Sequence, residues 1–336
     1  MSFVEPASPV TADSDGALRV GVIGAGVMGT NHGRVLAGLP NVVLVGIVDP
    51  LDEHRKRADD LIGCPVFADL DSLLAAGVDA VTIAAPTHLH HEISLACIAR
   101  GIHVLVEKPI ASTVEEGRAI VAAARRANVT LMVGHVERFN PAVAAIKKAI
   151  EGEDILSIAI TRVGPFPPRM SNVGVVIDLA VHDIDLIRWF TESDIVDVQP
   201  QLSSAVAERE DIALLQFRTA SGVLAHINTN WLTPFKARNV TVATRHKYVQ
   251  GDLLTRQVTE CFGFQPDGSY SMRHLPVGHD EPLRAELISF VDAVRSGTAP
   301  AVSGEQGVAS LEIATQCLAQ PANSAHAAKS PRRVAG

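Results

Sequence analysis

The chain has 336 residues, 47% of which are hydrophobic, and a formal net charge of −8 at pH 7. This length exceeds what one core ordinarily organises, so we expect about two domains, and the acidic balance without a basic cluster in the body of the chain argues against nucleic acid as a partner. No stretch approaches the roughly 18 uninterrupted apolar residues of a membrane helix, and the acidic N-terminus is unlike a signal peptide, which favours the cytoplasm.

The first half of the chain alternates short apolar runs with amphipathic segments. After a leader rich in Pro, Ser, Ala and Asp over residues 1–17, the apolar runs are LRVGVIG, VVLVGIVD, DAVTIAA, IHVLVE and TLMVG. Strands that alternate with helices predict an α/β domain built on a doubly wound parallel sheet. We therefore expect a Rossmann domain over residues 18–140.

The pattern changes after Pro141. One helical segment is followed by longer alternating runs such as ILSIAITRV, IALLQFRT and GVLAHINTN, and the last two helical patterns run from about Glu281 to Arg295 and from Gly304 to Leu318. This predicts an α+β domain with a mostly antiparallel open sheet over residues 141–320, and a flexible tail over 321–336. The segment TVATRHKY lacks the glycine that we expect in a turn between two of these strands.

A glycine motif lies directly after the first apolar run. Gly24, Gly26 and Gly29 form GxGxxG, with Val27 and Met28 between the last two glycines. Such a turn lets the backbone approach a pyrophosphate at the N-terminus of a helix, where free amide groups favour anions. The motif and its position between a strand and a helix predict a dinucleotide site that includes these five residues.

Asp49 ends the second apolar run, 20 residues after Gly29. A carboxylate at this distance can accept hydrogen bonds from both ribose hydroxyls of a dinucleotide. Its charge would repel a 2′-phosphate, and Pro50 follows where a phosphate-binding arginine would be convenient. We therefore predict NAD as the cofactor, with NADP as the alternative.

Polar residues follow three further apolar runs. Ligands of open α/β sheets bind outside the carboxyl ends of the strands, so these residues are candidates for cofactor and substrate contacts. The candidates for cofactor contacts are Pro86, Thr87, His90, Glu107 and Lys108, and the candidates for substrate contacts are His135, Glu137, Arg138 and Asn140.

Lys108 is the most informative of these positions. Pro109 fixes the backbone next to it, and an ammonium beside a nicotinamide could hold a substrate hydroxyl or help to remove its proton. The structural alternative is a salt bridge to Glu107.

A second pair of reactive residues lies in the second domain. On a helix Asp178 and His182, four residues apart, would share one face, so that the carboxylate could orient the imidazole or tune its charge. A histidine satisfied within the core is the alternative. Because oxidation of an alcohol needs a hydride acceptor and a base, we predict Lys108, Asp178 and His182 as the catalytic residues.

These residues together resemble the Gfo/Idh/MocA family, named after glucose-fructose oxidoreductase and inositol dehydrogenase. The resemblance runs from about Arg19 to Leu318 and rests on GAGVMG, on the tripeptide Glu-Lys-Pro at 107–109 and on DLAVH. It implies a substrate site lined by Lys108, Asp178 and His182, with the histidine as the usual candidate base. It also implies a homodimer or homotetramer formed through the face of the second sheet.

Longer segments are similar to a subgroup described as UDP-N-acetylglucosamine 3-dehydrogenases: GVMGTNHGRVL, VGHVERFNPAV, RVGPFPPR, GVVIDLAVHDIDLIRWF and NWLTPFKARNVTV. That likeness implies oxidation of a sugar nucleotide to a 3-keto sugar, and hence a bound diphosphate. Guanidinium groups match phosphate geometry, which makes four arginines candidates, with ordinary surface charge as the alternative for each. They are Arg138, Arg162, Arg169 and Arg238.

Other functions stay open from the sequence. They are an inositol, glycoside or aminoglycoside dehydrogenase, an NAD-dependent lyase that oxidises and then reduces its sugar again, and a non-catalytic sensor of dinucleotides. A sensor would be expected to lose the catalytic residues, which are all present. The four cysteines lack a CxxC pair, so we expect neither disulfides nor a metal site.

Overall fold

The computed structural model describes residues 16–167 and 173–319. Nearly all of the predicted leader, the whole predicted tail and Arg169 lie outside the described residues. The chain divides into two compact units, of which the first comprises Met1–Val136 and Glu281–Val308 and the second comprises Glu137–Asp280 and Ala309–Gly336. Along the described stretches, every helix is too short or too polar to cross a bilayer.

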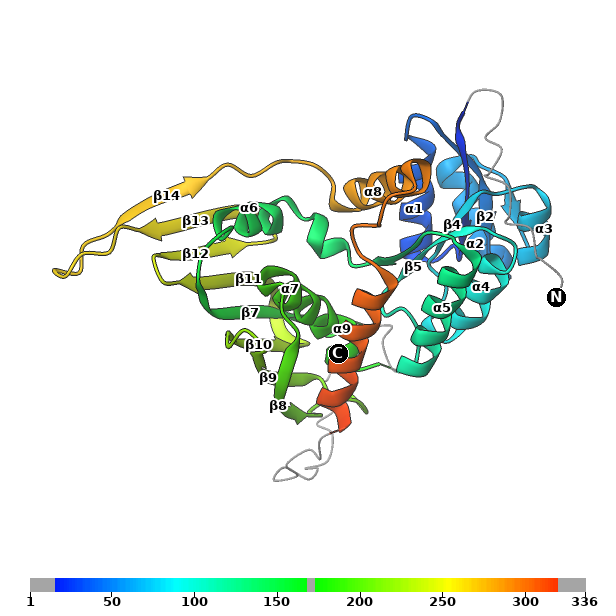
Figure 1. The fold of residues 1–336 in the computed structure, drawn as a ribbon. Coiled ribbons are helices and arrows are strands. Elements are labelled where there is room, and N and C mark those ends of the chain that lie inside the picture. Colours follow the sequence, from blue (N-terminus) through cyan, green and yellow to red (C-terminus); the bar gives the residue numbers. More distant parts are fainter. Residues whose placement is uncertain (1–15, 168–172, 320–336) are drawn as a thin grey trace, which may run out of the picture. The chain divides into compact units, whose positions relative to one another are not determined.

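The first unit is built on a six-stranded sheet with every pair of strands parallel, as the sequence predicted (Figure 1). The strand order is β3-β2-β1-β4-β5-β6. This is a doubly wound order: β2 and β3 extend the sheet on one side of β1, and β4, β5 and β6 extend it on the other side. Its strands are β1 (Leu18–Ile23), β2 (Val42–Val48), β3 (Val66–Phe67), β4 (Ala80–Ile83), β5 (His103–Glu107) and β6 (Leu131–Gly134).

Helices follow the strands of this sheet, and local signals in the sequence bound them. The fifth begins at a capping box, in which Thr113 accepts the backbone N–H of Glu116 and the Glu116 carboxylate accepts that of Thr113. It ends at Asn128, a residue in the left-handed conformation. The helices are α1 (Val27–Ala37), α2 (Asp52–Ile62), α3 (Leu70–Ala75), α4 (His90–Ile98) and α5 (Val114–Ala127).

A helix from the end of the chain returns to the first unit. This is α8 (Pro282–Ser296), which packs against α1. Arg34 pairs with Glu281 just before α8, and Arg295 in its last turn donates to the backbone oxygens of Gly16 and Asn41. The single boundary predicted between residues 140 and 141 misses this return, because the helical pattern of α8 does not indicate which core its apolar side joins.

The second unit is built on an eight-stranded sheet with the order β14-β13-β12-β11-β7-β10-β9-β8. Only β10 and β7 pair in parallel among its described strands, which confirms the predicted mostly antiparallel sheet. The strands are β7 (Ile155–Pro165), β8 (Ile195–Ser203), β9 (Ile212–Thr219), β10 (Leu224–Asn230), β11 (Leu232–Thr244), β12 (Lys247–Asp252), β13 (Gln257–Phe262) and β14 (Ser271–Leu275).

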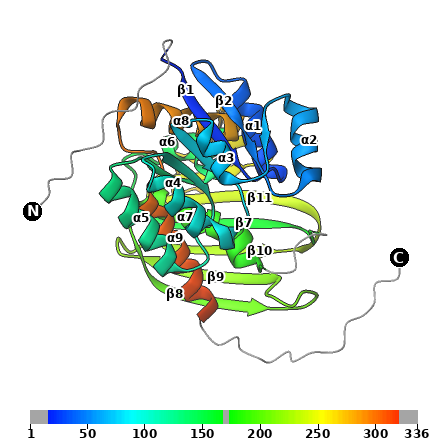
Figure 2. The same ribbon diagram turned by 90° about the vertical axis from the view of Figure 1, so that its right-hand side faces the viewer.

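Helices cover one face of this sheet (Figure 2). Helix α6 (Pro141–Ala149) lies on β12 and β13, α7 (Val181–Thr191) lies on β7, and α9 (Gly304–Ala319) adds Ile313 and Cys317 to the core. Side chains in β9 alternate between buried and exposed along the strand. The sheet therefore has one face in the core and one face open, as a half-buried antiparallel sheet requires.

The turn between β11 and β12 explains the missing glycine in TVATRHKY. The Thr244 hydroxyl accepts the backbone N–H groups of His246 and Lys247, at 3.2 and 2.9 Å. Arg245, within the turn, pairs with Asp154. A threonine side chain thus organises a turn for which the sequence led us to expect glycine.

Candidate active site

The glycine motif forms a tight turn between β1 and α1. A Cβ on Gly29 would lie 1.7 Å from the carbonyl oxygen of Gly24, and Gly24 itself has φ +96°. Helix α1 starts after Gly26 without a side-chain cap, so its first amide groups point to the turn. The side chains of Val27 and Met28 are exposed here. The cradle therefore has the form that a pyrophosphate requires.

Asp49 follows β2 and is tied to this turn. Its carboxylate accepts the backbone N–H groups of Ala25 and Leu51, at 2.8 and 2.9 Å, and lies 3.1 Å from Nδ1 of His54. Helix α2 also brings Arg57 to the turn, where its guanidinium donates to the carbonyl oxygen of Ala25 at 2.8 Å. The sequence argument considered only Pro50, the residue after Asp49, whereas α2 brings an arginine to the turn eight residues later.

The residues after β4 form a short 3-10 turn, Thr87–Leu89, that leads into α4. His90 was predicted to contact the cofactor, but its ring is buried between two carbonyl oxygens, those of Ala85 and Pro109, each 2.9 Å away. Burial lowers the pKa of His90, so the ring is neutral at pH 7 and donates to one of them. We therefore interpret His90 as a brace between the end of β4 and the segment after β5.

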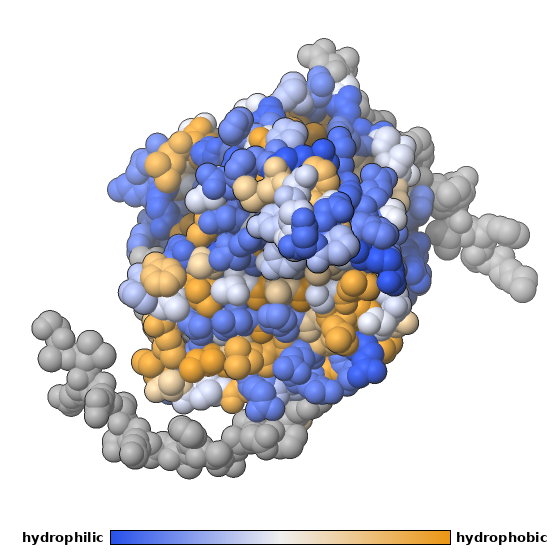
Figure 3. Space-filling view, turned by 90° about the vertical axis from the view of Figure 1, so that its left-hand side faces the viewer, coloured by the Kyte–Doolittle hydropathy of each residue, from blue (hydrophilic) through white to orange (hydrophobic). Residues whose placement is uncertain are grey.

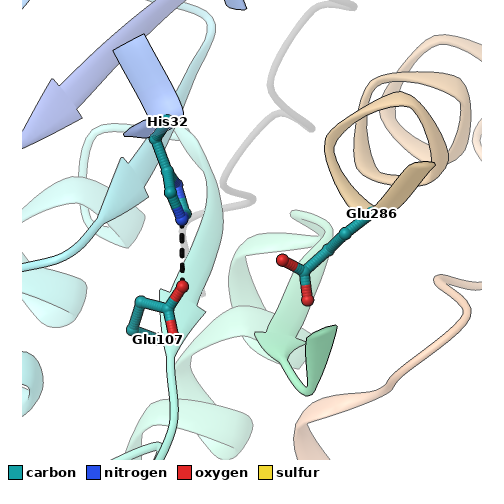
Figure 4. A group of neighbouring side chains, drawn as sticks. All are labelled: His32, Glu107 and Glu286. Carbon is teal, nitrogen blue, oxygen red and sulfur yellow. Dashed lines mark hydrogen bonds and ion pairs between the residues drawn. The ribbon is translucent and has the colours of Figure 1, made fainter. Parts of the chain in front are cut away.

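Lys108 follows Glu107 at the end of β5 and is half-buried. Glu107 has His32 of α1 as its side-chain partner, at 2.9 Å from Oε1 to Nε2 (Figure 4), while Oε2 accepts the backbone N–H of Lys108 at 3.3 Å. Burial alone would raise the pKa of Glu107, but the hydrogen bond from His32 and the charges of His32 and Lys108 outweigh it and lower the pKa. Sequence reasoning missed His32, although it stands three residues after Gly29 in a helix that opens at the cofactor turn.

Asp178 and His182 lie in one helical stretch of the second unit, and both are half-buried. The stretch does not continue as the regular α-helix that the sequence predicted, because Val176–Ala180, which contains Asp178, is π-helical, and α7 begins at Val181. A π-turn has hydrogen bonds from residue i to residue i+5 and is therefore wider than an α-helix. Such turns occur frequently at functional sites.

Four charged residues form a buried network beside this helix. Arg162 of β7 makes paired hydrogen bonds of 2.7 to 2.9 Å to Asp183, and its other nitrogen donates to Glu137 at 2.8 Å. Arg238 of β11 donates to the same oxygen of Glu137 at 2.9 Å. Although burial opposes ionisation, the charge of Arg162 lowers the pKa of Glu137. Burial and the charge of Arg162 lower the pKa of Arg238, although the charges of Glu137, Asp183 and Asp178 oppose this shift.

A second buried pair joins Arg138 to Asp185. The guanidinium donates through two nitrogens to the two carboxylate oxygens, each at 2.7 Å, and Ser310 of α9 lies 3.3 Å from one of those oxygens. The side chains of Arg138 and Arg162 are only 4% and 3% exposed. Their predicted role as donors to a diphosphate is therefore corrected, because carboxylates of the same unit already occupy both guanidinium forks.

Three further predicted substrate residues, Asn140, His135 and Arg238, differ in their hydrogen bonds and in their exposure. Asn140 caps α6 by accepting the N–H of Ala142 at 3.0 Å and donates to the carbonyl oxygen of Leu253. These bonds give Asn140 a structural role. His135 is 1% exposed, whereas the side chain of Arg238 is 36% exposed. Of the three arginines described among the four candidates, Arg238 alone keeps an accessible guanidinium.

Comparison with known proteins places this arrangement in a family. The model of the Gfo/Idh/MocA oxidoreductase family with an NAD-binding Rossmann fold matches residues 18–135, and the model of its C-terminal domain matches residues 155–249. The chain belongs to the Gfo/Idh/MocA family. It is therefore an oxidoreductase whose first unit is an NAD-binding domain.

Individual members of the Gfo/Idh/MocA family are similar over most of their length. UDP-N-acetylglucosamine 3-dehydrogenase from Acidithiobacillus ferrooxidans is 28% identical over 89% of this chain and 96% of its own. A solved structure of that enzyme superimposes with a TM-score of 0.84 over the same shares of the two chains. Inositol 2-dehydrogenase 4 from Saccharopolyspora erythraea is 31% identical over 95% of this chain and 96% of its own.

Replacement of Arg162 tests whether the network is structural. We expect Arg162→Met to lower the free energy of unfolding by about 3–5 kcal/mol, because Glu137 and Asp183 would remain buried without their shared cation. Urea unfolding measures this change. Arg245→Met removes an exposed ion pair with Asp154 and is the matched control, with a loss of at most about 1 kcal/mol. Equal losses in the two variants would contradict a structural role for the network.

Proposed function

We propose that this protein is an NAD-dependent dehydrogenase that oxidises a secondary hydroxyl on the ring of a sugar or sugar-like polyol. The setting of Lys108 carries the proposal. Strands β1, β4 and β5 are neighbours in a parallel sheet, so the glycine turn, Thr87 and Lys108 follow strand ends at one edge of that sheet. An ammonium group thus lies at the same sheet edge as the dinucleotide cradle.

The residues of the cradle fit a dinucleotide, since only glycine is tolerated where Gly24 and Gly29 meet. When NAD is bound there, its nicotinamide supplies the acceptor for the hydride. In the proposed reaction the Lys108 ammonium holds the oxygen of the substrate hydroxyl, His182 takes its proton, and Asp178 orients the imidazole. Asp49 would bind the ribose hydroxyls, which favours NAD over NADP.

The first candidate substrate is a UDP-N-acetylhexosamine oxidised at C3, since a relative of that activity matches nearly the whole chain. Arg238 is the described residue suited to contact its diphosphate. Inositol is the second candidate. It is supported by the similarity to inositol 2-dehydrogenase 4 and by the charge balance of the buried network. Two guanidinium groups there face two carboxylates, which suits an uncharged ring.

A substrate panel tests the proposed function. NADH formation is followed by its absorbance with NAD or NADP against UDP-N-acetylhexosamines, free sugars, aminoglycosides and inositols. We expect reduction of NAD with at least one ring alcohol and selectivity among the classes. Turnover confined to uncharged rings would support the proposed dehydrogenase activity and would rule out a sugar nucleotide as the substrate. Sugar conversion without net NADH would indicate the lyase, and NAD binding without any turnover would indicate the sensor.

Variants of the two proposed proton-handling residues test the mechanism. We expect Lys108→Ala and His182→Ala each to lower kcat by at least about 100-fold, the usual scale for acid-base groups, with the Kd for NAD almost unchanged. Lys148→Ala and His246→Ala remove exposed residues of the same types and are the matched controls. A wild-type kcat in either test variant would remove that residue from the mechanism.

The open face of the second sheet is our proposed interface between copies of this chain. Figure 3 shows apolar side chains gathered in bands on this face. Leu214 and Leu224 are 49% and 57% exposed there, and they border a hollow of about 550 Å³ that polar residues also line. We expect light scattering to give a dimer or tetramer whose mass falls in a double variant, Leu214→Arg with Leu224→Arg. A monomeric wild type at micromolar concentration would refute this interface.

A further inference from the structure

Arg57 of α2 brings a positive charge to the glycine turn of the first unit. Its Nη2 donates to the carbonyl oxygen of Ala25 at 2.8 Å, and this is the one hydrogen bond or ion pair that Arg57 makes with the described residues. The side chain is half-buried, and no described residue accepts from its Nε or Nη1. Because a guanidinium has five N–H donors, most of them stay available to a ligand at the turn.

The neighbouring arginine of α2 is engaged differently. Nη1 of Arg55 donates to the backbone oxygens of Asp49 and Pro50, each at 2.8 Å, and its Nη2 pairs with the carboxylate of Asp52 at 2.9 Å. The guanidinium of Arg55 therefore holds the segment between β2 and α2, and an ion pair offsets its charge. Arg57 forms no ion pair with a described carboxylate, so its charge remains to be matched by an anion.

The carboxylate of Asp49 has little capacity left for a ribose. Oδ2 accepts the backbone N–H of Ala25 and lies 3.1 Å from Nδ1 of His54, and Oδ1 accepts the backbone N–H of Leu51. Nδ1 carries the proton in this contact, because a carboxylate offers only acceptors. A carboxylate has about four lone-pair positions, and described donors fill three of them. Asp49 can therefore accept from one ribose hydroxyl, not from both as the sequence led us to expect.

Asp49 and Arg57 contact the same residue of the turn. Ala25 donates its N–H to Asp49 and accepts from Arg57 through its carbonyl oxygen, at 2.8 Å in both bonds. The carboxylate and the guanidinium thus flank one residue, on the side of the cradle next to β2. In dinucleotide-binding folds the ribose lies beside the carboxylate that ends this strand, and an arginine nearby accommodates a 2′-phosphate.

We propose that Arg57 is a specificity-determining residue that lets the protein bind NADP as well as NAD. The 3′-hydroxyl is common to both dinucleotides and can occupy the remaining acceptor position of Asp49. The 2′-phosphate of NADP would then meet the N–H groups of Arg57 that no described residue occupies, in charge-assisted hydrogen bonds. NAD stays the tighter ligand, because the charge of Asp49 opposes the phosphate. This inference rests on the dinucleotide site of the proposed function and not on its substrate.

Isothermal titration calorimetry of the full-length protein with NAD and with NADP tests the proposal without turnover. For the wild type we expect a Kd for NADP no more than about 100-fold above the Kd for NAD. Arg57→Gln removes the charge, and we expect it to raise the Kd for NADP at least about tenfold while the Kd for NAD changes less than about threefold. Arg57→Lys keeps the charge without the planar fork, so its Kd for NADP should lie between those two values.

Lys56→Gln is the matched control, because it removes the same charge from an exposed neighbour on α2. Salt screens exposed charges, so we expect both Kd values of this variant to stay within about twofold of the wild type. An equal rise of both Kd values in Arg57→Gln would mean that Arg57 only shapes the turn, and it would overturn the proposal. So would an unchanged Kd for NADP in that variant, or an equal loss in Lys56→Gln.

The binding measurements also separate this inference from the proposed reaction. The expected change in Arg57→Gln, found in a protein that oxidises no alcohol, would support the inference and count against the proposed reaction alone. A wild type that binds NAD but binds NADP more than about 100-fold more weakly would overturn the inference and leave the proposed reaction standing. A wild type that binds neither dinucleotide would overturn both.

Discussion

Carboxylates taken out of water hold the functional residues of both units in place. Glu107 accepts hydrogen bonds from His32 and from the backbone of Lys108, and Glu137 accepts from Arg162 and Arg238. Pairs of this kind contribute little net stability, because the loss of hydration offsets their attraction, but an unpaired member is expensive. These pairs leave few alternative arrangements for the side chains that form them. The buried partners therefore fix the positions of the reactive side chains.

The two sheets present their residues in different ways. In the first unit all strands are parallel, so their carboxyl ends meet at one edge, and the glycine turn and Lys108 reach that edge from separate strands. In the second unit the antiparallel sheet supplies Arg162 and Arg238 from neighbouring strands, paired at the same register. Helix α7 then adds Asp183, and the π-turn that precedes it carries Asp178. Site residues thus come from strand ends in one unit and from a sheet face with its covering helix in the other.

Local patterns predicted much of this arrangement, and long-range packing accounts for what they missed. Strand and helix periodicity predicted both sheets, and the GxGxxG spacing predicted the tight turn because steric limits admit only glycine there. The partners of Arg162 and Arg138 were not predictable, since a guanidinium fork fits a carboxylate of the same chain as well as a phosphate. Asp183 and Asp185 did leave a signal, as two acids that alternate with the apolar residues Ile184 and Leu186 in α7. The return of α8 to the first unit left none, because the pattern of a helix does not show which core it joins.

Charge balance bears directly on the substrate. Arg162 and Arg238 face Glu137 and Asp183, and Arg138 faces Asp185, so these described residues offer no net positive charge to an anion. Asp178 adds a negative charge within range of Arg238. A diphosphate bound here would have to compete with Glu137 for Arg238 or draw cations from elsewhere, whereas the hydroxyls of an uncharged ring could bond to the accessible edge of Arg238 without breaking an ion pair. The buried network therefore suits recognition of the ring, and a preference for a sugar nucleotide would need further cations beside Arg238.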